Sequence, residues 1–286
     1  MSMQSDALPA TVTFLPFRYA SKCKRNKQNG LPFVLDNVLD DLLILLLAFV
    51  PFSAHPLLTG LAIAAFHTSL WIIYEAGYVE NDRISARAEK QVKVAANFHA
   101  MSDAYSEKAA WIWAAVVGYL GACLTALIWS GDTSFDIETS LWIAAVWAVV
   151  LIALRATYVL YNRVDKMTRV MLYLPLQLIK YGFPALFVAL PAAGAAAIGA
   201  QIIRRWMPYI IYRFSNKKPE KFPARLIRLV TFVSLWVLLL PSAPLVQHLL
   251  LGALIGGWLL VRSATQIRLS VSNAQPVSKD SWVHRK

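Results

Sequence analysis

Long apolar runs dominate the pattern along the chain. A helix that spans a membrane needs about 20 mostly apolar residues. Eight runs of roughly that length are present, at about 31–52, 57–78, 109–130, 139–161, 170–190, 192–212, 226–240 and 245–261. Short turns rich in proline and serine separate several of them, which favours antiparallel neighbours. We therefore predict an all-α fold, a polytopic membrane bundle of about eight to nine transmembrane helices, with breaks near the prolines of 170–212.

Composition supports this interpretation. Of the 286 residues 58% are hydrophobic and only 15% are charged, whereas soluble domains carry about 25% charged residues. We therefore do not expect a soluble globular protein. The two cysteines, Cys23 and Cys123, provide neither a disulfide framework nor the spacing of a zinc site.

The net charge of +12 is explained by membrane orientation and does not require nucleic acid as a partner. Lysine and arginine collect in cytoplasmic loops, and 27 of the 28 fall in alternate connections, in the parts of the runs that lead into these connections, or at the two ends of the chain. We therefore expect both termini on the cytoplasmic side, in a bacterial cytoplasmic membrane. Residues 1–15 do not have the pattern of a signal peptide.

These features divide the chain into three parts. We expect a basic cytoplasmic segment over 1–30, a transmembrane domain over 31–262 with cytoplasmic loops at 80–108, 162–169 and 213–225, and a cytoplasmic tail over 263–286. The partners expected from this organisation are membrane lipids. The oligomeric state is left open.

Polar side chains gather where the second run reaches the cytoplasm. If that helix continues, residues three or four apart share one face; they are Trp71, Tyr74, Tyr78, Asp82, Ser85 and Glu89. Carboxylate and hydroxyl oxygens suit Mg²⁺, which commonly binds through one or two carboxylates and a substrate phosphate. The alternative is a solvated helix extension held by Glu–Arg pairs.

A second polar face follows the fourth run. Arg155, Tyr158, Asn162, Asp165 or Lys166, and Arg169 recur at helical spacing, and Arg163 lies among them. Arginine offers two parallel donors to a phosphate, so this face could hold a phosphorylated group. The alternative is that topology alone puts basic residues at such a helix end.

Two features lie deeper in the membrane. Asp36, Asn37, Asp40 and Asp41 fall within the first run, either facing the bundle or capping a short helix, and Lys180 lies inside the fifth. Ionisable groups at membrane depth are costly and commonly functional, so Lys180 is a candidate binding residue. It could also extend its amine to the interface from a tilted helix.

The polar end of the second run resembles the first aspartate-rich motif of the UbiA superfamily of intramembrane prenyltransferases, N-D-x-x-D-x-x-x-D. Here it reads Asn81-Asp82-x-x-Ser85-x-x-x-Glu89. The resemblance implies that Asn81, Asp82 and Glu89 hold Mg²⁺ against the diphosphate of an isoprenoid or sugar-phosphate donor. Ser85 replaces an acid of the motif, and Asp165 is the one carboxylate of the nearest second motif.

The resemblance implies a UbiA-like transferase that moves a prenyl or phosphoribosyl group, using a (poly)prenyl phosphate, a (poly)prenyl diphosphate or a sugar diphosphate. Asp82 and Asp165 would be catalytic, and the aromatic side chains Trp71, Tyr74, Tyr78 and Tyr158 would line the prenyl groove. The phosphate would be bound by Arg155, Arg163, Lys166, Arg169 and Lys180. One or two Mg²⁺ ions would be the cofactor, although the departures from the motif also fit a member that has lost catalysis.

Two other classes stay open at this stage. A transporter or flippase would use Asp36, Glu75 and Lys180 as a substrate path, and a non-catalytic scaffold would need no site at all. An enzyme of this kind gathers its polar groups at one membrane face, whereas a transporter commonly has a site near the midplane. Because the polar groups of the sequence cluster near the cytoplasmic side, we favour the transferase.

Overall fold

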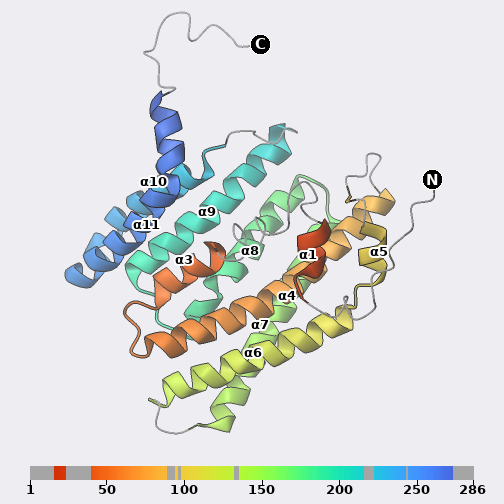
Figure 1. The fold of residues 1–286 in the computed structure, drawn as a ribbon, viewed down its shortest axis with the longest axis horizontal. Coiled ribbons are helices and arrows are strands. Elements are labelled where there is room, and N and C mark those ends of the chain that lie inside the picture. Colours follow the sequence, from red (N-terminus) through yellow and green to blue (C-terminus); the bar gives the residue numbers. More distant parts are fainter. Residues whose placement is uncertain are drawn as a thin grey trace, which may run out of the picture.

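The computed structural model describes residues 16–23, 40–88, 94–95, 98–131, 135–215, 222–242 and 244–272. Over these ranges the fold is all-helical, without strands (Figure 1). The helices are α1 (Arg18–Cys23), α3 (Asp40–Phe49), α4 (Pro56–Ala88), α5 (Phe98–Asp103), α6 (Glu107–Trp129), α7 (Ile137–Arg163), α8 (Thr168–Gly182), α9 (Ala192–Ser215), α10 (Ala224–Leu238) and α11 (Leu245–Ser272), with short 3₁₀ helices η3 (Phe183–Leu186) and η4 (Leu240–Ser242).

Each of the eight apolar runs overlaps a helix among the described residues, although 31–39 of the first run, with Asp36 and Asn37, lie outside them. Among the described residues, four helices are long and apolar enough to cross a membrane, namely α4, α6, α7 and α11. Their hydropathy is that of an integral membrane protein. Large apolar side chains such as Trp142, Ile152 and Leu250 are exposed on these helices, as expected of surfaces that face lipid.

Two boundaries differ from the sequence-based expectation. The helix α4 continues to Ala88, so residues 80–88 are helical rather than part of a loop, and α11 continues to Ser272 into the segment expected to be tail. The apolar run ends before the helix does in both cases, because a helix can continue past the membrane as an amphipathic or polar extension.

Helices α4, α6 and α7 pack together on one side of the bundle, while α3, α8, α9, α10 and α11 form the other side (Figure 1). Small residues allow close approach. Ala193, Ala196, Ala197 and Ala200 are buried on α9, and a Cβ atom added to Gly194 would lie 2.4 Å from the carbonyl oxygen of Ala48 on α3. The small residues of α9 therefore form a helix-packing surface.

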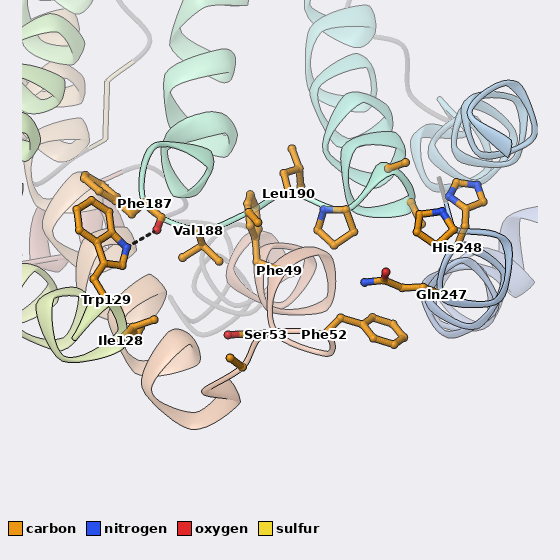
Figure 2. A pocket seen from close by; sticks show the side chains of 16 residues that line it. Phe49, Phe52, Ser53, Ile128, Trp129, Phe187, Val188, Leu190, Gln247 and His248 are labelled. Carbon is orange, nitrogen blue, oxygen red and sulfur yellow. Dashed lines mark hydrogen bonds between the residues drawn. The ribbon is translucent and has the colours of Figure 1, made fainter. Parts of the chain in front are cut away.

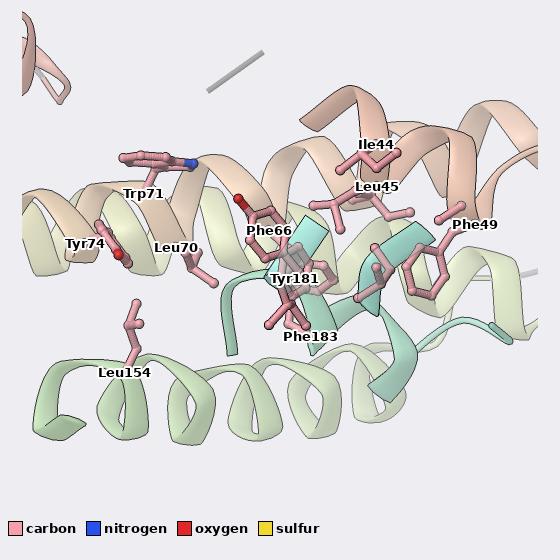
Figure 3. Packing of buried hydrophobic residues seen from close by; sticks show 14 of the residues in the cluster. Ile44, Leu45, Phe49, Phe66, Leu70, Trp71, Tyr74, Leu154, Tyr181 and Phe183 are labelled. Carbon is pink, nitrogen blue, oxygen red and sulfur yellow. The ribbon is translucent and has the colours of Figure 1, made fainter. Parts of the chain in front are cut away.

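A continuous apolar core joins the two sides. Leu70 and Tyr74 of α4 point toward Leu154 of α7, whereas Trp71 lies on the opposite side of α4; Tyr181 and Phe183 lie further along the same core, near Phe66 (Figure 3). Phe66 packs on Phe187 with ring centroids 4.8 Å apart and on Trp147 at 4.6 Å. The core therefore fixes α8 and η3 between α4 and α7.

The short helices α1 and α5 pack near the C-terminal end of α4 (Figure 1). Glu75 on α4 is 2% exposed and accepts hydrogen bonds from the backbone N–H groups of Phe17 (2.9 Å) and Ala20 (2.8 Å) at the start of α1. A carboxylate is favourable at a helix N-terminus because the first N–H groups have no partner within the helix. Glu75 thus holds α1 on the bundle.

Candidate functional site

Asp41, near the start of α3, lies at the centre of a buried set of charges. Its Oδ1 accepts hydrogen bonds from Tyr181 Oη (2.7 Å), Gln201 Nε2 (2.8 Å) and Arg205 Nη2 (2.6 Å), while its Oδ2 pairs with Lys180 Nζ (2.5 Å). The side chain of Asp41 is fully buried. Four donors therefore surround a carboxylate that has about four acceptor positions, so a further ligand would have to compete with them.

Asp40 binds a second group of cations. Its Oδ2 lies 2.8 Å from Arg204 Nη1 and 3.2 Å from Arg228 Nη1, and its Oδ1 lies 3.6 Å from Arg262 Nε. These arginines come from α9, α10 and α11. The two adjacent aspartates of one short helix therefore connect to four other helices of the bundle.

Gln201 on α9 joins the two aspartates into one network. Its Nε2 donates to Asp41, and its Oε1 accepts from Arg228 Nη1 at 2.9 Å and from Arg204 Nη1 at 3.3 Å. We call the connected side chains the charge cluster; they are Asp40, Asp41, Lys180, Gln201, Arg204, Arg205, Arg228 and Arg262. Within the part of the chain that the structure describes, five cations of this cluster face two carboxylates.

The side chain of Arg228 is fully buried. Its Nη1 is bonded to Asp40 and Gln201, but its Nε and Nη2 have no hydrogen-bond partner within the described part of the chain. A buried donor without a partner costs about 1–3 kcal/mol, and more when it is charged. Such unused N–H groups among several cations are what an anion-binding site requires.

Aromatic rings adjoin the cluster. Lys180 Nζ lies 4.3 Å from the centroid of the Trp71 ring. The Tyr74 ring packs against Trp71 (5.2 Å between centroids), Tyr78 (5.3 Å) and Tyr158 (4.9 Å). The structure therefore brings together the four aromatic residues predicted to line an apolar groove, and it connects them to Lys180.

The predicted metal ligands on α4 have a different role from that of the charge cluster. Asp82 is 8% exposed; its Oδ2 accepts from Tyr19 Oη at 2.8 Å and its Oδ1 from Asn81 Nδ2 at 3.3 Å. Burial and the neighbouring carboxylate raise the pKa of Tyr19, so its hydroxyl stays protonated and donates. Asp82 thus takes part in holding α1, while Glu89 lies outside the described residues.

Asp165 lies in the turn between α7 and α8 and is exposed. Its Oδ1 accepts from the backbone N–H groups of Met167 (2.8 Å) and Thr168 (3.1 Å), and its Oδ2 from the Thr168 hydroxyl. These hydrogen bonds hold the pKa of Asp165 below its ordinary value. The contacts of Asp165 are those of a helix cap.

The predicted phosphate-binding cations have separate environments. Arg155 pairs with Glu80 (2.6 Å) and Glu107 (2.8 Å), joining α7 to α4 and to α6. Arg169 donates to the backbone carbonyls of Val164 (3.1 Å) and Asn162 (3.0 Å) at the end of α7. Arg163 and Lys166 are exposed. Of the predicted set, Lys180 belongs to the charge cluster.

A pocket of about 420 Å³ lies at the other end of the bundle, beside the α3–α4 turn and the starts of α9 and α11 (Figure 2). Its walls include Phe49, Phe52, Trp129 and Phe187. The indole of Trp129 donates to the carbonyl of Phe187 at 3.0 Å (Figure 2). None of the described residues that line this pocket is Asp, Glu, Lys or Arg, so these walls suit an apolar group rather than a phosphate.

Sequence reasoning identified Lys180 but missed most of its partners. Gln201, Arg204 and Arg205 follow one another at helical spacing on α9, so they share a face; this signal was available. The arginines were instead counted as loop residues that set the orientation. Their position inside the bundle corrects that interpretation, because a basic residue near a helix end can face the core as well as water.

The Mg²⁺ site implied by the resemblance can be compared with these contacts. Four donors surround Asp41, Asp40 faces three arginines, and Asp82 binds Tyr19 and Asn81. Within the ranges described, no group of three or more His, Cys, Asp and Glu side chains gathers to hold a metal ion. The carboxylates that the structure describes therefore do not fit a magnesium site as they stand.

Comparisons with protein-family models, with curated proteins and with solved structures gave no match for this chain.

Proposed function

We propose that this protein binds the phosphate or diphosphate head of a membrane-embedded isoprenoid or polyprenyl lipid at the charge cluster. The observation that carries the proposal is the guanidinium of Arg228, which is fully buried among the cations around Asp40 and Asp41 and whose Nε and Nη2 lack a hydrogen-bond partner among the described residues. Guanidinium groups bind phosphate through two parallel hydrogen bonds. Their attraction is strong where water is largely excluded.

The apolar chain of such a lipid has a suitable neighbour in the aromatic rings of Trp71, Tyr74, Tyr78 and Tyr158. Trp71 lies against Lys180, so a head group at the cluster would have its chain beside these rings. Aromatic and aliphatic walls with a few polar groups at one end are typical of lipid and cofactor sites.

The reaction we propose is transfer of a prenyl or phosphoribosyl group, as the UbiA resemblance implies. When a diphosphate leaves a carbon atom, the oxygen that departs gains negative charge. Fixed cations at that position stabilise the transition state more than the ground state. Lys180, Arg204, Arg205 and Arg228 would supply this stabilisation, with no step assigned to a metal ion.

Membrane arrangement is part of the same proposal. Eight spans with both termini on the cytoplasmic side of a bacterial cytoplasmic membrane would account for the alternation of basic and bare connections. In this arrangement the apolar pocket would lie near the surface opposite the cytoplasm.

A second candidate function is transport or flipping of an anionic lipid. It is favoured by the depth of the cluster, because α3 has 10 residues and is therefore about 15 Å long. Asp40 begins this helix, so the cluster would lie near the middle of a core about 30 Å thick. Transporters commonly bind their substrates near the midplane.

Binding and turnover of defined lipids test the proposal. The purified protein in nanodiscs would be titrated with farnesyl diphosphate and undecaprenyl phosphate, with farnesol as the uncharged comparison. We expect the phosphorylated lipids to bind and Arg228→Gln to weaken them. Arg268→Gln, a change to an exposed arginine on α11, should have no effect. Binding of farnesol with equal affinity, or no binding of either phosphorylated lipid, would contradict the proposal.

The two candidate functions then separate by a second readout. Release of diphosphate in the presence of a panel of acceptors supports the transferase. Movement of a fluorescent polyprenyl phosphate between leaflets of a proteoliposome, without chemical change, supports the transporter. Both activities should fall in Arg228→Gln and persist in Arg268→Gln, because each depends on the same head-group site.

A further inference from the structure

We infer that the charge cluster binds its phosphate or diphosphate through side-chain cations alone, and that Asp40 and Asp41 act as internal counter-ions rather than as ligands of a divalent metal. The inference rests on the proposed function, since it concerns how the same head group is held. It departs from the Mg²⁺ dependence that the sequence resemblance implies.

The first support is the bonding of Asp41. Three donors converge on its Oδ1 and Lys180 Nζ lies 2.5 Å from its Oδ2. A metal ion at this carboxylate would have to displace Lys180 or Arg205. The side chains of Lys180 and Arg205 lie in the protein interior, with exposures of 5% and 19%. Whichever of them was displaced would therefore stay close to the incoming dication.

The second support is the charge around Asp40. Arg204 and Arg228 lie at 2.8 and 3.2 Å from the same oxygen, and Arg262 lies 3.6 Å from the other. A Mg²⁺ ion bound to Asp40 would therefore lie close to these arginines. Like charges that are this close repel strongly where the effective dielectric constant is low. Mg²⁺ also dehydrates reluctantly and usually keeps several waters, whereas the Asp40 side chain is only 2% exposed.

The third support is the use of the other described acids near the cytoplasmic end of α4. Glu75 binds backbone N–H groups of α1, Asp82 binds Tyr19, and Glu80 pairs with Arg155. Each of these carboxylates therefore already has a structural partner. Arg228, by contrast, has a side-chain Nε and Nη2 that donate to no described residue.

A phosphorylated ligand would therefore take over guanidinium N–H groups that otherwise donate to the carboxylates. Asp40 and Asp41 keep the cations together when no ligand is bound, because buried like charges without counter-ions would be very costly. The same carboxylates compete with the ligand for these donors. If Asp40 competes with the ligand in this way, neutralising Asp40 should strengthen anion binding. Neutralising a metal ligand would not have this effect.

The experiment measures the Kd of farnesyl diphosphate for the full-length protein in nanodiscs, in excess EDTA and in excess Mg²⁺. We expect binding in EDTA to be at least as tight as in Mg²⁺, because Mg²⁺ in solution pairs with the diphosphate and lowers its charge. Asp40→Asn should bind more tightly in EDTA than the wild type. Asp103→Asn, which changes an exposed acid on α5 by the same charge, should leave the Kd unchanged.

The outcomes separate the two proposals. Binding that requires Mg²⁺ and is lost in EDTA would overturn this inference while leaving the proposed head-group site intact. No binding in either condition would overturn both. If Asp40→Asn does not fold, as judged by gel filtration and thermal unfolding, the comparison of EDTA with Mg²⁺ in the wild type still decides the question.

Discussion

Lys180 Nζ lies 2.5 Å from Asp41 Oδ2, deep between α8 and α3, and the amine also faces the ring of Trp71 on α4. A lysine at this depth is costly unless it is paired. Its pairing with Asp41, together with the cation–π contact, offsets that cost. One ion pair therefore connects three helices at the point where the charge cluster meets the aromatic rings.

Neutralising Asp41 should destabilise the fold. Asp41→Asn leaves Lys180 and Arg205 without their carboxylate, and removal of one partner from a buried ion pair costs about 3–5 kcal/mol. Thermal unfolding of the protein in detergent should show a markedly lower Tm. Asp103→Asn provides the control, because exposed substitutions of this kind change stability by less than about 0.5 kcal/mol. Equal Tm values for the two variants would show that the pair is not structural.

The close contact of α3 with α9 should be equally sensitive. A Cβ atom at Gly194 would lie 2.4 Å from the backbone oxygen of Ala48, whereas one at Gly257 on α11 would have no neighbour within 4 Å. We expect Gly194→Ala to lower the Tm because the backbone must move. Gly257→Ala should keep or raise it, since alanine is favoured over glycine in a helix by about 0.5–1 kcal/mol. The reverse order of Tm values would refute this packing.

Much of the fold could be predicted because long apolar runs in a sequence indicate membrane helices. The runs at 109–130 and 139–161 differ from α6 and α7 by only a few residues at each end. The run at 170–190 was harder, because Pro184 lies where α8 gives way to the 3₁₀ helix η3. Proline cannot donate a backbone hydrogen bond, so its sequence position indicated a break without indicating its form.

The candidate site was predictable only in part, for a physical reason. Asp41 and Lys180 are 139 positions apart in the chain, and no local pattern reports a contact over that separation. Arg228 illustrates the same limit: from the sequence it is one more basic residue near a helix start, yet its side chain is fully buried. Periodicity indicates which residues share a helix face, but packing between helices decides which face meets which.

Glu75 should control the docking of α1. Its two oxygens accept from the N–H groups of Phe17 and Ala20, and Glu75→Gln keeps only one acceptor oxygen. We expect faster hydrogen exchange at these two amides, with little change in the helices α6 and α7. Glu138→Gln, at the exposed start of α7, is the matched control. Unchanged exchange at Phe17 and Ala20 would contradict the capping role of Glu75.

Asp165 should behave as a helix cap with a defined pH dependence. Hydrogen bonds from Thr168 lower its pKa, so the ionised form is stabilised by folding. The contribution is fully present above the unfolded pKa of about 3.9 and is lost as the pH falls through the lower folded value. Asp165→Ala should therefore cause faster hydrogen exchange at the start of α8 at neutral pH but not at pH values below that range.

The same variant separates capping from catalysis. If Asp165 acts only on α8, Asp165→Ala should keep the affinity for farnesyl diphosphate that Arg228→Gln loses. Loss of affinity in Asp165→Ala, with the hydrogen exchange of α8 unchanged, would instead restore Asp165 as a residue of the binding site.

Cysteine labelling should decide how many helices cross the membrane. In a background lacking Cys23 and Cys123, single cysteines would replace Met167, between α7 and α8, and the exposed Ser272 at the end of α11. With eight spans, α8, α9, α10 and α11 all cross after Met167, and an even number of crossings returns Ser272 to the same side. If only α4, α6, α7 and α11 cross, one crossing separates the two positions.

We expect the eight-span arrangement. A membrane-impermeant maleimide applied to intact cells should then leave both cysteines unlabelled until the membrane is opened. Labelling of Ser272→Cys alone would instead mean that α8, α9 and α10 together cross the membrane twice or not at all. At least one of these three helices, which carry cations of the charge cluster, would then not cross the membrane.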